Sequence, residues 1–348
     1  MQMLWFWLVS VMMAIYAVMD GFDFGAGALH LLVARTDAER REVLAAIGPL
    51  WDGNEVWLLA GGGALFLAFP AVLAAGFSGF YLAMFMVIWT LALRGIAIEF
   101  RSHVQDELWR AFWDFVFACA SILMPVLLGA ALGNVVRGVP LDASGAFQIP
   151  LFTTFGTGNP VGILDWYTIL MGVLVLVTLT AHGAVFLAWK TTGAVHARCA
   201  RLARPLWLAV AVLAGLATLA TAQVNPTVYR NLPHAPLAWV GLALFLAGLA
   251  VVATGLRGGR FLLAFLGSGG FIIGILAATA ASVWPVMLRS TLDPAWSLTA
   301  HNASASAHGL RVGLAWWLLG FPLAVGYFAV LFWLHRGKVK APSEGQGY

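Results

Sequence analysis

Long apolar runs dominate the chain, and the short stretches between them carry most of the charges. A transmembrane helix needs about 20 predominantly apolar residues. The segments that meet this length are residues 4–33, 51–74, 77–98, 112–134, 161–189, 205–224, 236–255, 261–285 and 310–334. A short hairpin is expected at Gly76 and a polar loop over 135–160. The pattern predicts an all-α integral membrane protein with nine transmembrane helices.

Composition agrees with this pattern and narrows the class. Hydrophobic residues make up 61% of the chain and charged residues 10%, against roughly 45–50% and about 25% in soluble domains. The first run lacks a basic leader and a small-residue cleavage site, so we interpret it as a helix of the mature chain. We expect a single polytopic domain over residues 1–338 and a disordered tail over 339–348. A net charge of +4 does not point to nucleic acid, and no such partner is expected.

Lysine and arginine set the expected orientation, because basic residues are retained on the cytoplasmic side of a membrane. Fifteen of the 19 fall in one alternating set of connections, and the other set holds only four: Arg137, Arg230, Arg289 and Arg311. An eight-span interpretation would remove this asymmetry. The sequence therefore predicts a multi-pass membrane protein with an external N-terminus and a cytoplasmic C-terminus.

Two acids interrupt the first apolar run, in "VMDGFDFGAG". Asp20 lies about 23 Å from either end of that run at ~1.5 Å per residue, close to mid-membrane. Asp23 shares its helix face, and a charge at such a depth costs ~2.5–3.5 kcal/mol. Gly21 and Gly25 on this helix permit the close approach of a neighbour. The pair is either a buried structural partner of an arginine or a proton-exchanging site.

A second group of polar residues opens the second run, "GPLWDGNEVWLLAGGGALFLAFP". Asp52 and Glu55 have the spacing of a helix N-terminal capping pair, although acids at a cytoplasmic mouth also suit proton uptake. Trp51 and Trp57 are candidates for membrane-interface anchors. Gly61 lies in a triple-glycine stretch that again favours close packing.

The third group is "LRGIAIEFRSH". Arg94 is expected near the inner end of the third run, within reach of Asp20, Asp23 or Asp52. Glu99 and Arg101 are expected closer to the surface and solvated. Further along the chain, an ordinary helix pair is predicted between Arg110 and Asp114, and helix-dipole stabilisation accounts for Asp165.

Ligands for a cofactor are weakly represented. His182 is the one histidine clearly inside a run, and no second histidine faces it at helical spacing. Cys119 and Cys199 form no CxxC or CxxCH motif, so a disulfide framework, an iron–sulfur site and a covalent c-type haem are all unsupported. No metal site is predicted in this chain.

Six sequence blocks carry a family resemblance. They are "DGFDFGAG", "GPLWDGNEVWLLAGGGALFLAFP", "FSGFY", "LRGIAIEFR", "GNVVRGVP" and "SLTAHNASAS", in this order from Asp20 to Ser306. Together they resemble subunit II of the cytochrome bd-type quinol oxidases, with fewer matching positions between about Arg204 and Ser282. The form "GNEVWL", in which Glu55 stands where other members carry glutamine, resembles the branch that includes cyanide-insensitive enzymes.

The resemblance implies a fold of two four-helix bundles plus a peripheral helix. It implies a respiratory quinol:O2 oxidoreductase that generates proton motive force, in which haem b558, haem b595 and haem d are ligated by a partner, subunit I. A small accessory subunit, membrane lipid and quinone are further expected partners. This chain would support assembly and supply proton and O2 access, without catalytic residues of its own.

The resemblance also assigns candidate roles to individual residues. It implies a contact of Trp51 with a bound quinone and a place for Trp57 at the mouth of an O2 route. Together with the acids above, it gives a set of proton-path candidates: Asp20, Asp23, Asp52, Glu55, Arg94 and Glu99.

Two other functions fit some of the same residues. A proton-coupled secondary transporter also carries intramembrane acids, but such proteins usually show repeated, broken helices in both halves, whereas the polar features here concentrate in residues 20–114. A structural subunit, in which the acids only fix assembly, is the second alternative.

Overall fold

The computed structural model describes residues 1–339. Its helices and strands, in chain order, are α1 (Gln2–Val33), α2 (Asp37–Ile47), α3 (Trp51–Ala68), α4 (Pro70–Gly79), α5 (Tyr81–Phe100), α6 (Glu107–Arg137), α7 (Trp166–Lys190), α8 (Gly193–Val224), α9 (Thr227–Asn231), η1 (Leu232–His234), α10 (Pro236–Arg257), α11 (Phe261–Val283), β1 (Val286–Leu288), η2 (Pro294–Trp296), β2 (Leu298–Thr299) and α12 (Ala307–Leu334).

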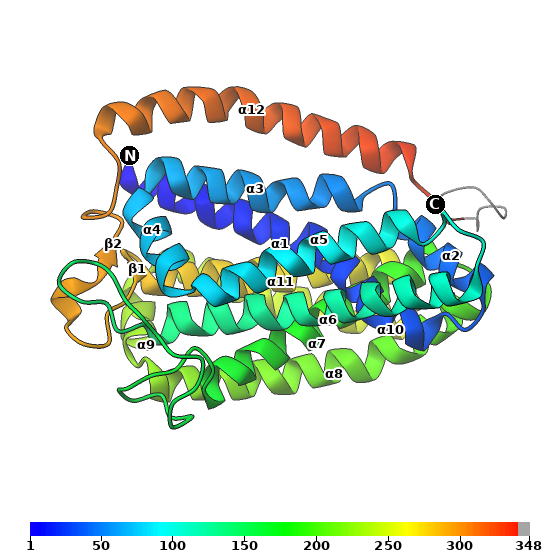
Figure 1. The fold of residues 1–348 in the computed structure, drawn as a ribbon, viewed down its shortest axis with the longest axis horizontal. Coiled ribbons are helices and arrows are strands. Elements are labelled where there is room, and N and C mark those ends of the chain that lie inside the picture. Colours follow the sequence, from blue (N-terminus) through cyan, green and yellow to red (C-terminus); the bar gives the residue numbers. More distant parts are fainter. Residues whose placement is uncertain (340–348) are drawn as a thin grey trace.

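The long helices lie roughly side by side (Figure 1). Within residues 1–339, eight helices are individually long and apolar enough to cross a membrane, and α3 with α4 makes a ninth if that bent pair counts as one span. The prediction of a nine-span, all-α membrane protein is confirmed. Figure 1 also shows α12 at the edge of the molecule, beside α3. The grouping of the other helices into two bundles stays a prediction.

The second predicted span differs from the structure in one respect. The helix that begins at Trp51 ends at Ala68, and after Phe69 the chain turns by 117° into α4. Proline lacks an N–H and disfavours helical backbone in the residue before it, and Phe69 accordingly has φ −138° and ψ 60° ahead of Pro70. The hairpin expected at Gly76 is wrong, because Gly76 lies inside α4 and the chain turns again at Phe80.

Polar caps explain where several helices begin. The Thr36 hydroxyl accepts a hydrogen bond from the Glu39 backbone N–H, and the Glu39 carboxylate accepts one from the Thr36 backbone N–H. The two bonds form a capping box at the start of α2. α6 and α8 begin earlier than expected, at Glu107 and Gly193, because helical turns continue beyond the apolar part of each span.

The two ends of the helix array are different. The N-terminal end, as we call it, holds Met1, α9, the antiparallel pair β1–β2 and the loop 138–165 (Figure 1). Val139 exchanges backbone hydrogen bonds of 2.9 Å with Arg289 and Thr291, which ties that loop to the β1 segment. The opposite end, the α2 end, holds α2 and the last described residues. The tail predicted over 339–348 lies outside the described residues except for Val339, whose N–H donates to the Lys190 carbonyl at 2.7 Å.

Close helix packing in the core follows the glycines. A Cβ built on Gly25 would collide with the Leu179 carbonyl and with Gly183 on α7, and one on Gly21 would lie 2.9 Å from the Leu179 side chain. The expected close approach of a helix to Gly21 and Gly25 is therefore present, and its partner is α7. In the triple-glycine stretch, Gly61 packs against Met13, whereas a Cβ on either of the next two glycines would meet nothing within 4 Å.

Candidate functional site: a buried carboxylate cluster

Three helices bring their ionisable side chains together inside the protein. Arg94 of α5 donates to Asp20 of α1 at 2.5 Å and, through its other terminal nitrogen, to Glu55 of α3. Asp20 and Arg94 are completely buried, while the Glu55 side chain keeps 23% of its exposure. The guanidinium therefore joins a sealed carboxylate to one that still reaches the surface.

Asp23 lies beside this ion pair without a guanidinium of its own. Its Oδ2 accepts a hydrogen bond of 2.7 Å from the Asn54 side chain on α3. Arg94 also lies over the face of Phe24, with 4.2 Å between the guanidinium carbon and the ring centroid, a cation–π contact that helps to hold its position. Three carboxyl groups, of Asp20, Asp23 and Glu55, thus surround one arginine.

The charges of this carboxylate cluster do not balance when every carboxyl group is ionised. One guanidinium offsets one carboxylate, and an uncompensated charge in a dry site costs several kcal/mol. Oxygens without a hydrogen bond of normal geometry also remain, namely Asp20 Oδ2, Asp23 Oδ1 and the hydroxyl of Tyr16, which lies close to Asp20. Protons bound in the cluster would reduce its excess negative charge, and these oxygen atoms are available to bind them.

The structure brings four of the predicted proton-path residues together and leaves two apart. Asp52 is exposed in the first turn of α3, and Glu99 is exposed near the end of α5. The interpretation of Asp52 and Glu55 as a capping pair is wrong, since no side chain caps α3 and Glu55 pairs with Arg94 instead. Of the three acids considered as partners of Arg94, only Asp20 bonds to it directly.

The two tryptophans occupy different surroundings. Trp51 is half-buried against α5, where a Cβ on Gly95 would lie 3.2 Å from its ring. Trp57 is 5% exposed and packs against Phe321 and Phe328 of α12, with ring centroids 5.9 and 5.5 Å away. The expectation that Trp57 is a membrane-edge anchor is wrong, because α12 covers it.

A second charged cluster, which the sequence did not reveal, lies toward the α2 end. Asp114 of α6 accepts hydrogen bonds from His30 at 2.6 Å, from Arg40 at 2.9 Å and from the Arg101 Nε at 2.6 Å. The ordinary helix pair predicted between Arg110 and Asp114 is wrong, and so is the solvated Arg101, which is 2% exposed. Asp114 and its three partners come from four separate segments, so helical spacing gave no signal of these contacts.

Arg110 and Arg101 instead pair with Asp37 on α2, at 3.2 and 2.7 Å. Burial alone would raise the pKa of Asp37. The hydrogen bond from Arg101 and the charges of Arg101, Arg41 and Arg110 outweigh burial and lower that pKa below its usual range. The contact between α2 and the long helices thus has an electrostatic part that depends on an ionised carboxylate, in addition to the buried apolar side chains of Val43, Leu44 and Ile47.

Asp165 combines the predicted position at a helix start with a partner that was not foreseen. It caps α7 by accepting from the backbone N–H groups of Tyr167 and Thr168, at 2.9 and 2.8 Å. Its other oxygen pairs with Arg137 at the end of α6. The sequence contained a signal for this pair, because Arg137 lies at the end of one long apolar run and Asp165 near the start of the next, at the same membrane face.

The two fully buried histidines are engaged in hydrogen bonds within the chain. His182 Nε2 donates to the Val18 carbonyl at 3.0 Å, and its Nδ1 lies 2.5 Å from the Ser268 hydroxyl. His30 donates to Asp114. Across residues 1–339 there is no group of three or more His, Cys, Asp or Glu side chains that could hold a metal ion.

Comparisons with known proteins agree on one family. Residues 1–335 match the sequence family described as cytochrome bd terminal oxidase subunit II. The chain is 30% identical to the cytochrome bd-I ubiquinol oxidase subunit 2 of Escherichia coli (strain K12), over 97% of this chain and 95% of that protein. It is 32% identical to the cytochrome bd ubiquinol oxidase subunit 2 of Bacillus subtilis (strain 168), over 97% and 96% of the two chains.

A solved structure shows the same fold. It is described as bd oxidase from Geobacillus thermodenitrificans, and the alignment covers 96% of this chain and 98% of that one with a TM-score of 0.73. The sequence identity is 19%, so this match supports the arrangement of helices and not the role of any residue.

Proposed function

Since this chain belongs to the cytochrome bd terminal oxidase subunit II family, we propose that it supports a haem-bearing subunit I and carries protons toward the site of O2 reduction. The complex is a respiratory oxidoreductase of the bacterial inner membrane, and this chain is one of its subunits. The family membership also decides against the alternative of a proton-coupled secondary transporter.

The haems are the first part of the proposal. The family implies haem in the complex, and we infer that haem b558, haem b595 and haem d are all ligated by subunit I. When bound, they supply the electron transfer and O2 chemistry. The engaged state of His30 and His182 supports this division of labour, and this chain then contributes no catalytic residue of its own.

The carboxylate cluster is the observation that carries the proton path. Reduction of O2 to water consumes four protons, so ionisable groups must lead from the cytoplasmic surface to a buried site. Asp52 and Glu99 lie at the surface, and the partly exposed Glu55 bonds to Arg94, which bonds to the buried Asp20. We assign the surface acids to proton uptake, and Asp20 and Asp23 to the buried part of the path.

Arg94 has a positioning role in this path. Its single charge pairs with Asp20 and Glu55, but it cannot offset both together with Asp23. A proton that arrives at Glu55 can therefore move inward to Asp20 when the Arg94 guanidinium shifts its hydrogen bonds from one carboxylate to the other. This exchange needs only small side-chain movements, because Arg94 already contacts Asp20 and Glu55.

We assign one tryptophan to each of the other substrates, quinol and O2. Ubiquinol is the substrate named for the relatives from E. coli and B. subtilis, and we propose a quinol as the electron donor here. Half-buried Trp51 is the proposed quinone contact. Trp57, enclosed by apolar rings of α12, is the proposed lining of an O2 route, since O2 is apolar and partitions into hydrocarbon.

One experiment tests the proposal as a whole. This chain is co-expressed with its genomic partner, and the purified complex is examined by reduced-minus-oxidised spectra and by quinol-dependent O2 uptake. We expect haem d and haem b bands in the complex and no haem with the chain expressed alone. Haem recovered stoichiometrically with the isolated chain would contradict the assignment of all ligands to subunit I.

A further inference from the structure

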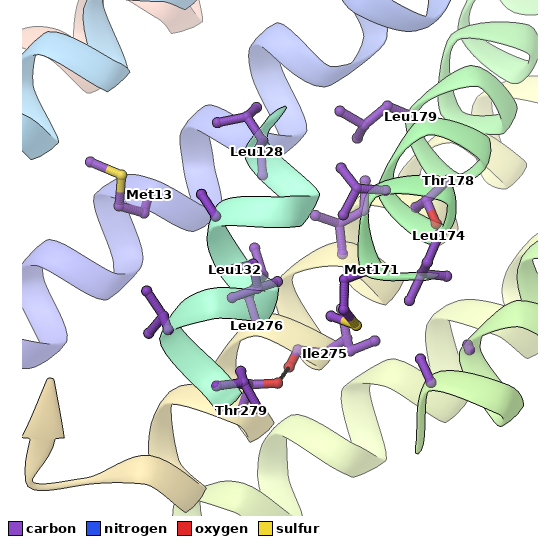
Figure 2. A pocket seen from close by; sticks show the side chains of 18 of the residues that line it. Met13, Leu128, Leu132, Met171, Leu174, Thr178, Leu179, Ile275, Leu276 and Thr279 are labelled. Carbon is purple, nitrogen blue, oxygen red and sulfur yellow. Dashed lines mark hydrogen bonds between the residues drawn. The ribbon is translucent and has the colours of Figure 1, made fainter. Parts of the chain in front are cut away.

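A large apolar cavity lies between α1, α6, α7, α8 and α11, next to the carboxylate cluster, since Tyr16 and Phe24 belong to its wall. Its volume is about 450 Å³, roughly three times that of an engineered protein cavity of ~150 Å³ that stays dry and binds benzene. Figure 2 shows aliphatic side chains of Leu128, Leu132, Leu174 and Leu276 around it. Among the described residues that line this cavity, none carries a charge.

The cavity is long, and most of its hydroxyl groups lie at one end, although Tyr16 and Thr178 lie deeper. Along α7 its wall extends from Tyr167 to Leu179, which is about 18 Å at ~1.5 Å per residue and close to half of the ~30 Å hydrocarbon core of a bilayer. Tyr167 lies at the N-terminal end of the helix array and its hydroxyl bonds to Thr221 at 2.8 Å. The Tyr229 hydroxyl, at the same end, donates to the Thr218 carbonyl.

A groove on the outer side of α8 borders this cavity. It lies between α8 and α10, and Ala214 and Thr218 belong both to its wall and to the wall of the cavity. Small side chains at these positions leave the two spaces separated by little more than the α8 backbone. The neighbouring Leu216 and Leu219 are exposed, so the groove opens to the lipid phase and not to water.

We propose that this cavity binds one acyl chain of a phospholipid from the leaflet at the N-terminal end, with its headgroup left outside at that end. The length matches a single leaflet, most of the hydroxyls gather where the chain would meet its ester groups, and the deep part around Leu179 is apolar except for Thr178 and Tyr16. Water is a poor occupant at the N-terminal end, because the Tyr167 and Tyr229 hydroxyls there already have partners within the protein.

The depth of the cavity gives the bound chain a consequence. Tyr16 and Phe24 line its α1 wall, and Asp20 lies one helical turn from each. An acyl chain there excludes water between Asp20 and the N-terminal end, so protons would reach Asp20 from the α2 end only. This sealing role rests on the proposed proton path, whereas the binding of the chain does not.

The binding is tested by filling the cavity in the intact complex. Ala214→Phe introduces a ring at the shared wall, and Leu208→Phe, on the same helix but 68% exposed, is the matched control. Complexes are purified in detergent and their retained phospholipid is quantified by native mass spectrometry. We expect Ala214→Phe to retain one phospholipid fewer than wild type and the control, at equal haem content.

Three outcomes would overturn the assignment. They are equal phospholipid retention in Ala214→Phe and wild type, loss of lipid in the control as well, and stoichiometric quinone in place of the displaced phospholipid. Leu276→Phe, on α11, fills the same cavity from another wall and should lose the same lipid. It keeps the test decisive if Ala214→Phe lowers the haem content.

The sealing role has a separate measurement. Leu132→Asn makes the cavity wall polar, and Leu123→Asn places the same change on an exposed part of α6. In vesicles of E. coli phospholipid, we expect several-fold faster passive proton leak for Leu132→Asn than for Leu123→Asn. Lipid loss without added leak would overturn the sealing role, and with it the link to Asp20, while leaving the acyl-chain site in place.

Discussion

Arg94 donates a hydrogen bond of 2.5 Å to Asp20 although 74 residues separate them in the chain. The same guanidinium bonds to Glu55, so neither carboxylate is its sole partner. Loss of one carboxylate therefore does not leave the arginine unpaired, and the effect of losing a proton carrier can be measured separately from the effect of losing the ion pair.

Asp20→Asn should therefore permit assembly while lowering turnover. Asparagine keeps the size of the side chain but cannot carry a proton, and Arg94 retains Glu55. We expect a normal haem spectrum with quinol-dependent O2 uptake reduced at least tenfold, and partial recovery in Asp20→Glu. Normal turnover in the double variant Asp20→Asn, Asp23→Asn would exclude the proposed path.

Removal of both partners should have the opposite effect on assembly. In Asp20→Asn, Glu55→Gln the guanidinium of Arg94 remains buried without a directly bonded carboxylate, which costs on the order of 3–5 kcal/mol. We expect yield and haem content to fall together. Adding Arg94→Gln should restore assembly without restoring turnover, and a double variant with wild-type yield would contradict the buried charge pair.

Close packing of α1 on α7 gives a prediction about stability. Gly25→Ala places a methyl group against the Leu179 carbonyl and Gly183, so the two helices must separate. Overpacking of this kind costs about 1–3 kcal/mol. Thermal unfolding should shift downward in Gly25→Ala but not in Gly62→Ala, where a Cβ meets nothing within 4 Å. Equal shifts would show that the α1–α7 contact tolerates the methyl group.

Acid should loosen the α2 end. The hydrogen bond from Arg198 lowers the pKa of Glu39, and Arg101 and its neighbours lower that of Asp37. A lowered pKa means that each carboxylate stabilises the fold above its unfolded-state pKa of about 4, and that this contribution disappears as pH falls through the folded value. Protection of the α2 amides from hydrogen exchange, measured relative to the intrinsic exchange rate at each pH, should therefore fall as the pH drops below about 4. In Asp37→Asn, Glu39→Gln this loss of protection should largely disappear, whereas in Glu107→Gln, at the exposed start of α6, it should persist.

Trp57 offers a test of the O2 route. Because it packs against Phe321 and Phe328, Trp57→Ala should open space beneath α12, while Trp57→Phe keeps an aromatic ring there. We expect a several-fold change in apparent O2 affinity for alanine, a smaller one for phenylalanine, and little change in turnover at saturating O2. Identical O2 dependence in the two variants would assign Trp57 to helix packing alone.

The sequence by itself determined the spans and their alternation. A lipid bilayer requires each crossing segment to be apolar and to satisfy its own backbone hydrogen bonds, so length and composition are sufficient to find the helices. The same local rules placed Asp20 and Asp23 on one helix face and set Gly25 at a close helix contact.

Only the tertiary structure decided which side chains meet. The 117° bend at Phe69, the choice of Glu55 over Asp52 as second partner of Arg94, and the partners of Asp114 depend on contacts between segments far apart in the chain. Within one helix, spacing fixes direction but not neighbours. Arg101 shows the consequence, because a charged residue that local pattern places in water lies buried among carboxylates from two other helices.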